Sequence, residues 1–147
     1  MIFPEGLTQS QAVRPYAASL NLLRDAGLRP TRQRLSLAKL LFNSGEARHV
    51  TAEKLHEEAL ADGVKVSLAT VYNTLHQFTE AGLLNELVID SSRIYFDTNT
   101  DSHHHFYNCA TGALYDVPKE DVVVSHLPQP PKGARMAGVH VVMYIDE

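Results

Sequence analysis

The segment that decides the fold is SLATVYNTLHQFTEAGLL, residues Ser67 to Leu84. Its apolar residues recur at intervals of three and four, which predicts an amphipathic helix that begins after an N-cap at Ser67 and ends at Gly82. The opposite face carries neutral hydrogen-bonding groups: Thr70, Tyr72, Asn73, His76 and Gln77. Such groups can read the edges of DNA bases. An ordinary core helix with a polar outer surface would show the same pattern.

The elements on either side favour DNA binding. Apolar periodicity and capping signals predict three earlier helices, over about residues 10–26, 31–43 and 51–62, each followed by a glycine. After Gly82 the sequence alternates apolar and polar residues, which predicts a β-hairpin over 83–90 and 93–98 with Ser91–Ser92 as its turn. Short helices that lead into a polar-faced helix and a hairpin are typical of a winged helix-turn-helix.

The remainder of the chain predicts a second, smaller domain. Residues 99–102 are polar and are expected to form a hinge, so that residues 1–98 make the DNA-binding domain and residues 103–147 the second domain. Strands are expected over 104–109, 113–117 and 139–145, with a short helix over 119–127. Because about 45 residues bury little surface alone, this domain is expected to pack against a second copy. The fold class is therefore α+β, an N-terminal winged helix-turn-helix followed by a small α/β dimerisation domain.

The charge distribution is compatible with DNA despite a net charge of −4. The stretch from Arg14 to Ser44 holds six basic residues against a single acid, Asp25, and such a local patch attracts phosphates. Arg29, Arg32 and Arg34 are therefore candidate phosphate contacts. As solvated surface charges they would need no such role.

Composition excludes several classes of protein. With 44% hydrophobic and 20% charged residues, the chain is neither intrinsically disordered nor a coiled coil. It has no apolar run of the ~18 residues that a membrane span needs and no signal pattern, so a cytoplasmic protein without membrane contact is expected. The single cysteine, Cys109, excludes an internal disulfide and an all-thiolate zinc site.

The distribution of histidine is unusual, because three of the eight histidines are consecutive, His103 to His105. On a strand His103 and His105 would point to one face and His104 to the other, so two different sites are expected. Imidazole suits zinc, iron, copper, nickel or haem iron, and nearby carboxylates can complete such a site. A hydrolytic metalloenzyme is not expected, because His56 lacks a second histidine four residues later and no other catalytic signature occurs.

Four segments of the chain resemble the ferric uptake regulator family. They are GLRPTRQRL at Gly27–Leu35, HVTAEKL at His49–Leu55, the helix segment Ser67–Leu84, and HHHFYNC at His103–Cys109. Within that family the chain is most similar to the iron response regulator branch. The resemblance implies a homodimeric transcription regulator, such as a repressor, of iron uptake and haem metabolism genes. Its partner would be an A·T-rich inverted repeat in double-stranded DNA.

The resemblance also assigns roles to residues that face DNA. Tyr72 matches a tyrosine of the recognition helix, Asn73 stands where an arginine is usual, and Arg29 matches a basic position that enters the minor groove. Together with the residue chemistry above, this gives a DNA-binding set of Arg29, Arg32, Ser67, Thr70, Tyr72 and Asn73.

Two ligand sites follow from the same resemblance. A sensory metal site between the domains would comprise His49, Asp97, His104 and Asp116, and the usual final histidine falls on Phe106. A second site, in the dimerisation domain, would comprise His103, His105, Glu120 and His140. The structural zinc that the family holds with C-x-x-C pairs is expected to be absent, because Cys109 has no partner cysteine.

These departures lead to the expected mechanism. Loss of one metal ligand and retention of the histidine triplet favour a haem sensor, in which haem held by His103–His105 modulates DNA affinity. The alternative is a direct sensor of divalent iron, manganese or zinc. A more remote alternative is a metal-binding enzyme or storage module.

Overall fold

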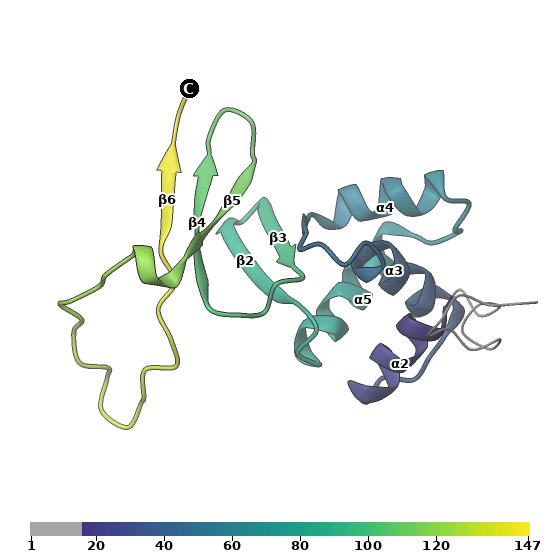
Figure 1. The fold of residues 1–147 in the computed structure, drawn as a ribbon, viewed down its shortest axis with the longest axis horizontal. Helices are drawn as coiled ribbons and strands as arrows, with labels where there is room; N and C mark the ends of the chain where they lie inside the picture. Colours follow the sequence, from purple (N-terminus) through teal and green to yellow (C-terminus); the bar gives the residue numbers. More distant parts are fainter. Residues whose placement is uncertain (1–15) are drawn as a thin grey trace, which may run out of the picture. The chain divides into compact units, whose positions relative to one another are not determined.

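The computed structural model describes residues 16–147 and divides the chain into two compact units, Met1–Thr100 and Asp101–Glu147 (Figure 1). We refer to them as unit 1 and unit 2 and describe each by itself. Arg14 and the start of the expected first helix lie outside the described residues. None of the described helices is both long enough and apolar enough to cross a bilayer. The hinge over 99–102 stays a prediction.

Unit 1 contains the helices that the sequence predicts. They are α2 (Ala17–Asp25), α3 (Arg32–Phe42), α4 (Ala52–Ala61) and α5 (Leu68–Glu80). The predicted N-caps of the last three are confirmed, because Thr31, Thr51 and Ser67 each accept a hydrogen bond from the backbone N–H three residues later, over 3.1–3.2 Å. Each such bond satisfies one of the donors that the first turn of a helix leaves unpaired.

A three-stranded sheet follows the helices in unit 1. The predicted hairpin is β2 (Asn85–Asp90) and β3 (Arg93–Asp97), and β1 (His49–Val50) pairs with the other edge of β3, giving the order β1-β3-β2. At the turn, hydrogen bonds from Arg93 and Ser92 hold the pKa of the Asp90 carboxyl at about 2. Strand β1 was not predicted, because two residues are too few to show a strand alternation. Its register places His49 directly opposite Asp97.

The core of unit 1 forms where the apolar faces of the helices meet the inner face of the sheet. Val71, Leu75 and Phe78 on α5 are fully buried. They pack with completely buried residues from the other elements: Leu23, Leu37, Leu41, Leu55 and Phe96. Gly82 has φ +84°, a conformation that costs little only without a Cβ, and it turns the chain from α5 towards β2.

Unit 2 is built on three strands. They are β4 (His103–Asn108), β5 (Leu114–Pro118) and β6 (Val142–Ile145), in the order β5-β4-β6, with β5 antiparallel and β6 parallel to β4. The short helix expected over 119–127 is wrong, since only one 3₁₀ turn, η1 (Lys119–Asp121), is present. Three consecutive β-branched residues, Val122 to Val124, follow that turn, and such residues lose side-chain freedom in a helix.

We predict that Thr51→Ala lowers the free energy of unfolding by about 1 kcal/mol, because the α4 N–H that now bonds to the hydroxyl loses its partner. Urea unfolding followed by circular dichroism measures the change. Thr51→Ser keeps the hydroxyl and is the matched control, expected within about 0.5 kcal/mol of the wild type. An alanine variant as stable as the serine variant would contradict the capping role.

Candidate functional site

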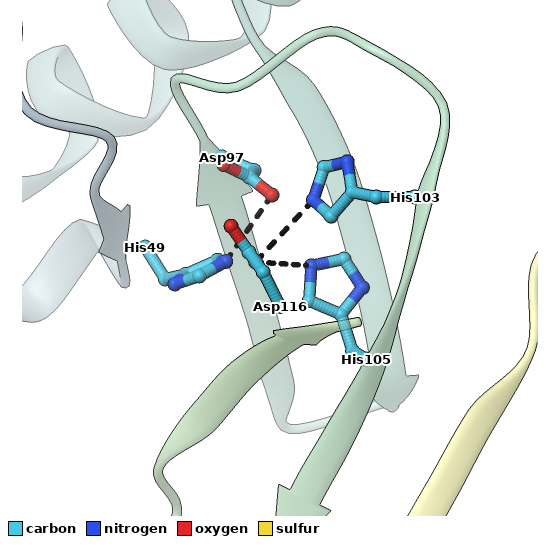
Figure 2. A group of neighbouring side chains, drawn as sticks. All are labelled: His49, Asp97, His103, His105 and Asp116. Carbon is cyan, nitrogen blue, oxygen red and sulfur yellow. Dashed lines mark ion pairs between the residues drawn. The ribbon is translucent and has the colours of Figure 1, made fainter. Parts of the chain in front are cut away.

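Two histidines and a carboxylate converge on one face of the sheet in unit 2. The pleat of β4 points His103 and His105 to the same side, and the β4–β5 register places Asp116 opposite His105. The Nε2 atoms of His103 and His105 lie 3.4 and 3.3 Å from Asp116 Oδ1 (Figure 2). Both imidazoles thus direct a ring nitrogen towards the same carboxylate oxygen.

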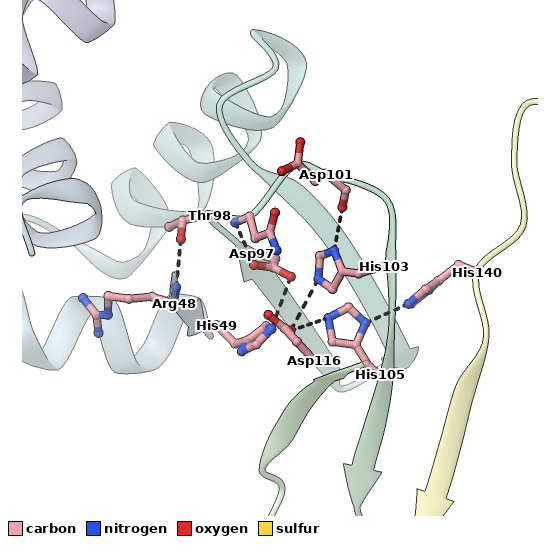
Figure 3. Close-up of polar contacts among 10 residues, drawn as sticks. Arg48, His49, Asp97, Thr98, Asp101, His103, His105, Asp116 and His140 are labelled. Atoms are coloured by element: carbon pink, nitrogen blue, oxygen red, sulfur yellow. Dashed lines mark hydrogen bonds and ion pairs between the residues drawn. The ribbon is translucent and has the colours of Figure 1, made fainter. Parts of the chain in front are cut away.

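The contact of His103 Nδ1 determines which nitrogen of the ring carries a proton. His103 Nδ1 lies 2.6 Å from the carbonyl oxygen of Asp101 (Figure 3). Because a carbonyl oxygen only accepts, Nδ1 carries a proton, and in the neutral ring the lone pair is on Nε2. That lone pair and the negatively charged Asp116 carboxylate repel each other. A cation between them, or a proton on Nε2, would turn this repulsion into attraction. A histidine whose outer N–H is bound to a carbonyl is the usual arrangement of a metal ligand.

His140 extends the cluster on the side of β6. His105 Nδ1 lies 2.8 Å from His140 Nε2 (Figure 3), so one of these nitrogens donates to the other. His104 lies on the opposite face of β4, where its Nδ1 accepts a hydrogen bond from the Val141 N–H at 2.9 Å. The expected separation of His104 from its two neighbours is therefore present.

The grouping in unit 2 differs from the sets that the resemblance implied. Asp116 lies with His103 and His105, whereas the resemblance grouped it with His104. Of the expected second set, His103, His105 and His140 come together. Glu120 is exposed on η1 and makes no ion pair among residues 16–147. The alternation within β4 was predictable from the sequence, but the register of β5 against β4 was not.

A second imidazole–carboxylate pair lies in unit 1. Strand β1 holds His49 opposite Asp97 on β3, with His49 Nε2 3.2 Å from Asp97 Oδ2 (Figure 2). The other oxygen of Asp97 accepts a hydrogen bond from the Asn99 N–H at 2.8 Å. The Arg48 N–H donates to Thr98 Oγ1 at 2.8 Å and ties β1 to the end of β3 (Figure 3). The fold thus brings together the two ligands that the resemblance placed in this part of the chain.

Both groups have the donor chemistry of a transition-metal site. In each unit the ligand atoms lie within 4.8 Å of one another, a spacing that a single ion can bridge. Imidazole nitrogen suits zinc and iron, carboxylate oxygen suits manganese, and mixed sets of the two bind all of these ions.

The polar face of α5 carries the candidate DNA contacts. Ser67 caps the helix and donates to Thr70 Oγ1 at 2.9 Å, while the Asn73 side chain is exposed and makes no hydrogen bond among the described residues. Tyr72 donates its hydroxyl proton to Glu53 Oε1 on α4 at 2.9 Å. That hydrogen bond, with a smaller effect of desolvation, raises the pKa of Tyr72 above its usual value of 10.0.

The candidate arginines lie around the start of α3. Arg29 and Arg32 are exposed. Arg34 reaches α5, donating from Nη1 to the Arg29 carbonyl at 2.8 Å and from Nη2 to Gln77 Oε1 at 2.9 Å. Gln77 was one of several polar residues in the helix pattern and was not among the predicted site residues. Its pairing with Arg34 spans 43 positions, which no local pattern signals.

Comparisons with known proteins agree with these features. A model of the ferric uptake regulator family matches residues 25–144. The ferric uptake regulation protein of Bordetella parapertussis is 32% identical over 101 residues, 68% of this chain and 72% of the relative. The peroxide-responsive repressor PerR of Staphylococcus aureus is 35% identical over 98 residues, 67% of this chain and 65% of the relative. This chain therefore spans just under two thirds of PerR.

A solved structure extends the comparison to the fold. The ferric uptake regulator from Pseudomonas aeruginosa with manganese is similar with a TM-score of 0.63 at 30% identity, covering 86% of this chain and 96% of that one. This likeness confirms the expected fold class, α+β with a winged helix-turn-helix and a small dimerisation domain.

We predict that Glu53→Gln lowers the pKa of Tyr72 towards its usual value, because the amide oxygen is a weaker acceptor and carries no charge. A raised pKa means that this interaction stabilises the fold fully below pH 10 and that the stabilisation is lost as the pH rises through the pKa of the folded state. NMR titration of the Tyr72 ring measures the shift. Glu57→Gln, an exposed neighbour on α4, is the control and should leave the pKa of Tyr72 unchanged. Equal values in both variants would refute the assigned cause.

Proposed function

The chain belongs to the ferric uptake regulator family, and from this we propose that it is a homodimeric, metal-responsive transcriptional repressor. It binds double-stranded DNA through the winged helix and senses divalent iron, manganese or zinc directly. The family membership that the sequence resemblance implied is confirmed over residues 25–144. The comparisons do not specify the iron response regulator branch.

The observation that carries the proposal is the arrangement around Asp116. Two imidazole Nε2 atoms face one carboxylate oxygen at 3.3–3.4 Å, and the Asp101 carbonyl fixes the His103 tautomer that can bind a metal. Such a set gains binding energy from a small cation that replaces protons between its members. We propose that His103, His105 and Asp116 bind the ion in unit 2, with His140 orienting His105.

The His49–Asp97 pair supports a ligand role in unit 1. Its imidazole and carboxylate come from paired strands and are 3.2 Å apart. The comparisons include a ferric uptake regulator with manganese, and we extend binding of a divalent ion to this chain. That one ion takes ligands from both units, as the resemblance implied, stays a prediction.

Haem sensing, the expectation from the sequence, is not supported. The relatives are named for ferric uptake and peroxide response, and the solved structure contains manganese. In unit 2 the His103 ring has one nitrogen against the Asp101 carbonyl and the other against Asp116, so a haem iron held by this ring would have to displace one of these two groups. The direct divalent-metal sensor, the alternative from the sequence, is therefore favoured.

For DNA we propose that α5 enters the major groove. Asn73 is exposed and can pair with adenine, while Ser67 and Thr70 at the start of the helix can contact bases or phosphates. Tyr72 already donates its proton to Glu53, so its ring is better suited to a thymine methyl group than its hydroxyl is to a phosphate. Arg29 and Arg32 supply contacts to the backbone or the minor groove.

Homodimerisation is proposed for unit 2. On one face of its sheet Phe106 and Tyr115 lie directly opposite each other on β4 and β5 and are 36% and 51% exposed. Exposed aromatic residues on so small a unit are typical of an interface. A two-fold dimer would present its recognition helices to an inverted, A·T-rich repeat whose half-sites are about 34 Å apart.

We predict that DNA binding requires a divalent ion. Protein treated with a chelator should not bind a duplex selected by the metal-loaded protein from a random library. Addition of manganese, zinc or ferrous iron should restore binding in a gel-shift assay. Tyr72→Ala should lose sequence preference while keeping its dimer and metal content. Tyr144→Ala, which truncates an exposed aromatic residue of β6 outside the proposed interface pair, tests whether any aromatic truncation has this effect.

Two outcomes would contradict the proposal. One is sequence-specific binding that is unaffected by chelation, which would remove the metal from the mechanism. The other is a metal-loaded protein that prefers no duplex, which would favour the enzyme or storage alternative.

We also predict that Asp116→Asn weakens zinc binding by at least about tenfold, because the ion loses a charged ligand between two imidazoles. Calorimetric titration of zinc into the dimer measures the affinity. Asp121→Asn removes an exposed acid of η1 and is the matched control, expected to leave the affinity unchanged. An equal loss in both variants would point to a general charge effect rather than a ligand.

A further inference from the structure

A groove of about 380 Å³ lies between the start of α3 and the polar face of α5. No carboxylate lines it. Two guanidinium groups, three threonine hydroxyls and three side-chain amides do, contributed by Arg29, Thr31, Gln33, Arg34, Thr70, Asn73, Thr74 and Gln77. A wall with two cations and many neutral donors is suited to an anion rather than to an apolar ligand.

Arg34 is held in this groove by two neutral acceptors. Its Nη1 donates to the Arg29 carbonyl and its Nη2 to Gln77 Oε1, at 2.8 and 2.9 Å. Because both acceptors are uncharged and Arg34 forms no ion pair among residues 16–147, its positive charge is not neutralised within the described chain. A guanidinium has five N–H donors, so three remain to bind a ligand.

The contact with Gln77 determines how that side chain is oriented. Arg34 can only donate, so the amide oxygen of Gln77 must face it and the amide nitrogen must point away. The bond connects α3 to α5 and restrains a long side chain that would otherwise sample many rotamers. Binding by a restrained arginine loses less conformational entropy than binding by a mobile one.

We propose that this groove binds one phosphate of the DNA backbone, that Arg34 is its principal ligand, and that Gln77 is a positioning residue that preorients Arg34. The inference deepens the proposed DNA-binding function and rests on it. A backbone phosphate, rather than a base, is the partner because the Arg34 guanidinium is fixed between two helices and is tied to a backbone carbonyl, which limits its reach towards base edges. Phosphate contacts position a protein on DNA without reading its sequence.

The test measures DNA affinity against salt concentration for four single variants of the full chain. The probes are a duplex selected by the metal-loaded wild type and a scrambled duplex, both followed by fluorescence anisotropy. Arg34→Met removes the positive charge, whereas Arg34→Lys keeps the charge but cannot make both hydrogen bonds of the guanidinium. Gln77→Leu removes only the hydrogen bond to Arg34. Gln77→Glu keeps a hydrogen-bond acceptor for Arg34 but neutralises its positive charge. Circular dichroism checks that each variant is folded.

The variants should separate charge from orientation. Arg34→Met and Gln77→Glu should reduce the slope of log affinity against log salt by about 0.9 and weaken binding roughly tenfold at ~0.1 M salt, equally on both duplexes. Arg34→Lys and Gln77→Leu keep the positive charge and should keep the slope, while the lost orientation weakens binding by roughly threefold. If Gln77 had only a structural role, Gln77→Glu would not lower the salt slope while Gln77→Leu left it unchanged.

Three results would overturn the inference. An unchanged slope in Arg34→Met would show that no phosphate contact is lost, and Gln77→Glu, which neutralises the same charge, provides that comparison if the methionine variant does not fold. A penalty confined to the selected duplex would indicate base reading instead. Tight, Arg34-dependent binding of inorganic phosphate without DNA would indicate a small-anion site. If the wild type prefers no duplex over the scrambled one, the proposed function itself fails, which is a distinct outcome.

Discussion

The burial of one face of α5 is the constraint on which the rest of unit 1 depends. Val71, Leu75 and Phe78 are fully buried, and they fix the rotation of the helix about its axis. With 3.6 residues per turn, burying that stripe leaves Asn73 and Gln77 on the outside of the unit. The polar face of α5 is therefore set by core packing, and the residues proposed to face DNA need not stabilise the fold themselves.

The sequence predicted what local interactions determine. The caps at Thr31, Thr51 and Ser67 and the hairpin turn at Ser91–Ser92 each depend on residues a few positions apart, so the pattern along the chain was sufficient to find them. The helix expected over 119–127 is absent because the three consecutive valines that follow Asp121 disfavour a helix.

What the sequence could not predict depends on residues that meet only after folding. The placement of Asp116 beside His103 and His105 comes from the register of β5 against β4, and a shift of one residue would have turned Asp116 to the other face. The contact of Arg34 with Gln77 likewise requires α3 and α5 to be packed. A histidine triplet thus predicts that ligands exist, whereas the fold decides which carboxylate joins them.

The short strand β1 lies close in sequence to a residue that contacts α5. His49 lies in β1, Thr51 caps α4 two residues later, and Glu53 in the first turn of α4 accepts the proton of Tyr72 on α5. Only three residues separate His49 from Glu53, the hydrogen-bond partner of Tyr72. Strand β1, the cap of α4 and the carboxylate bound by Tyr72 are thus parts of one five-residue segment, His49–Glu53.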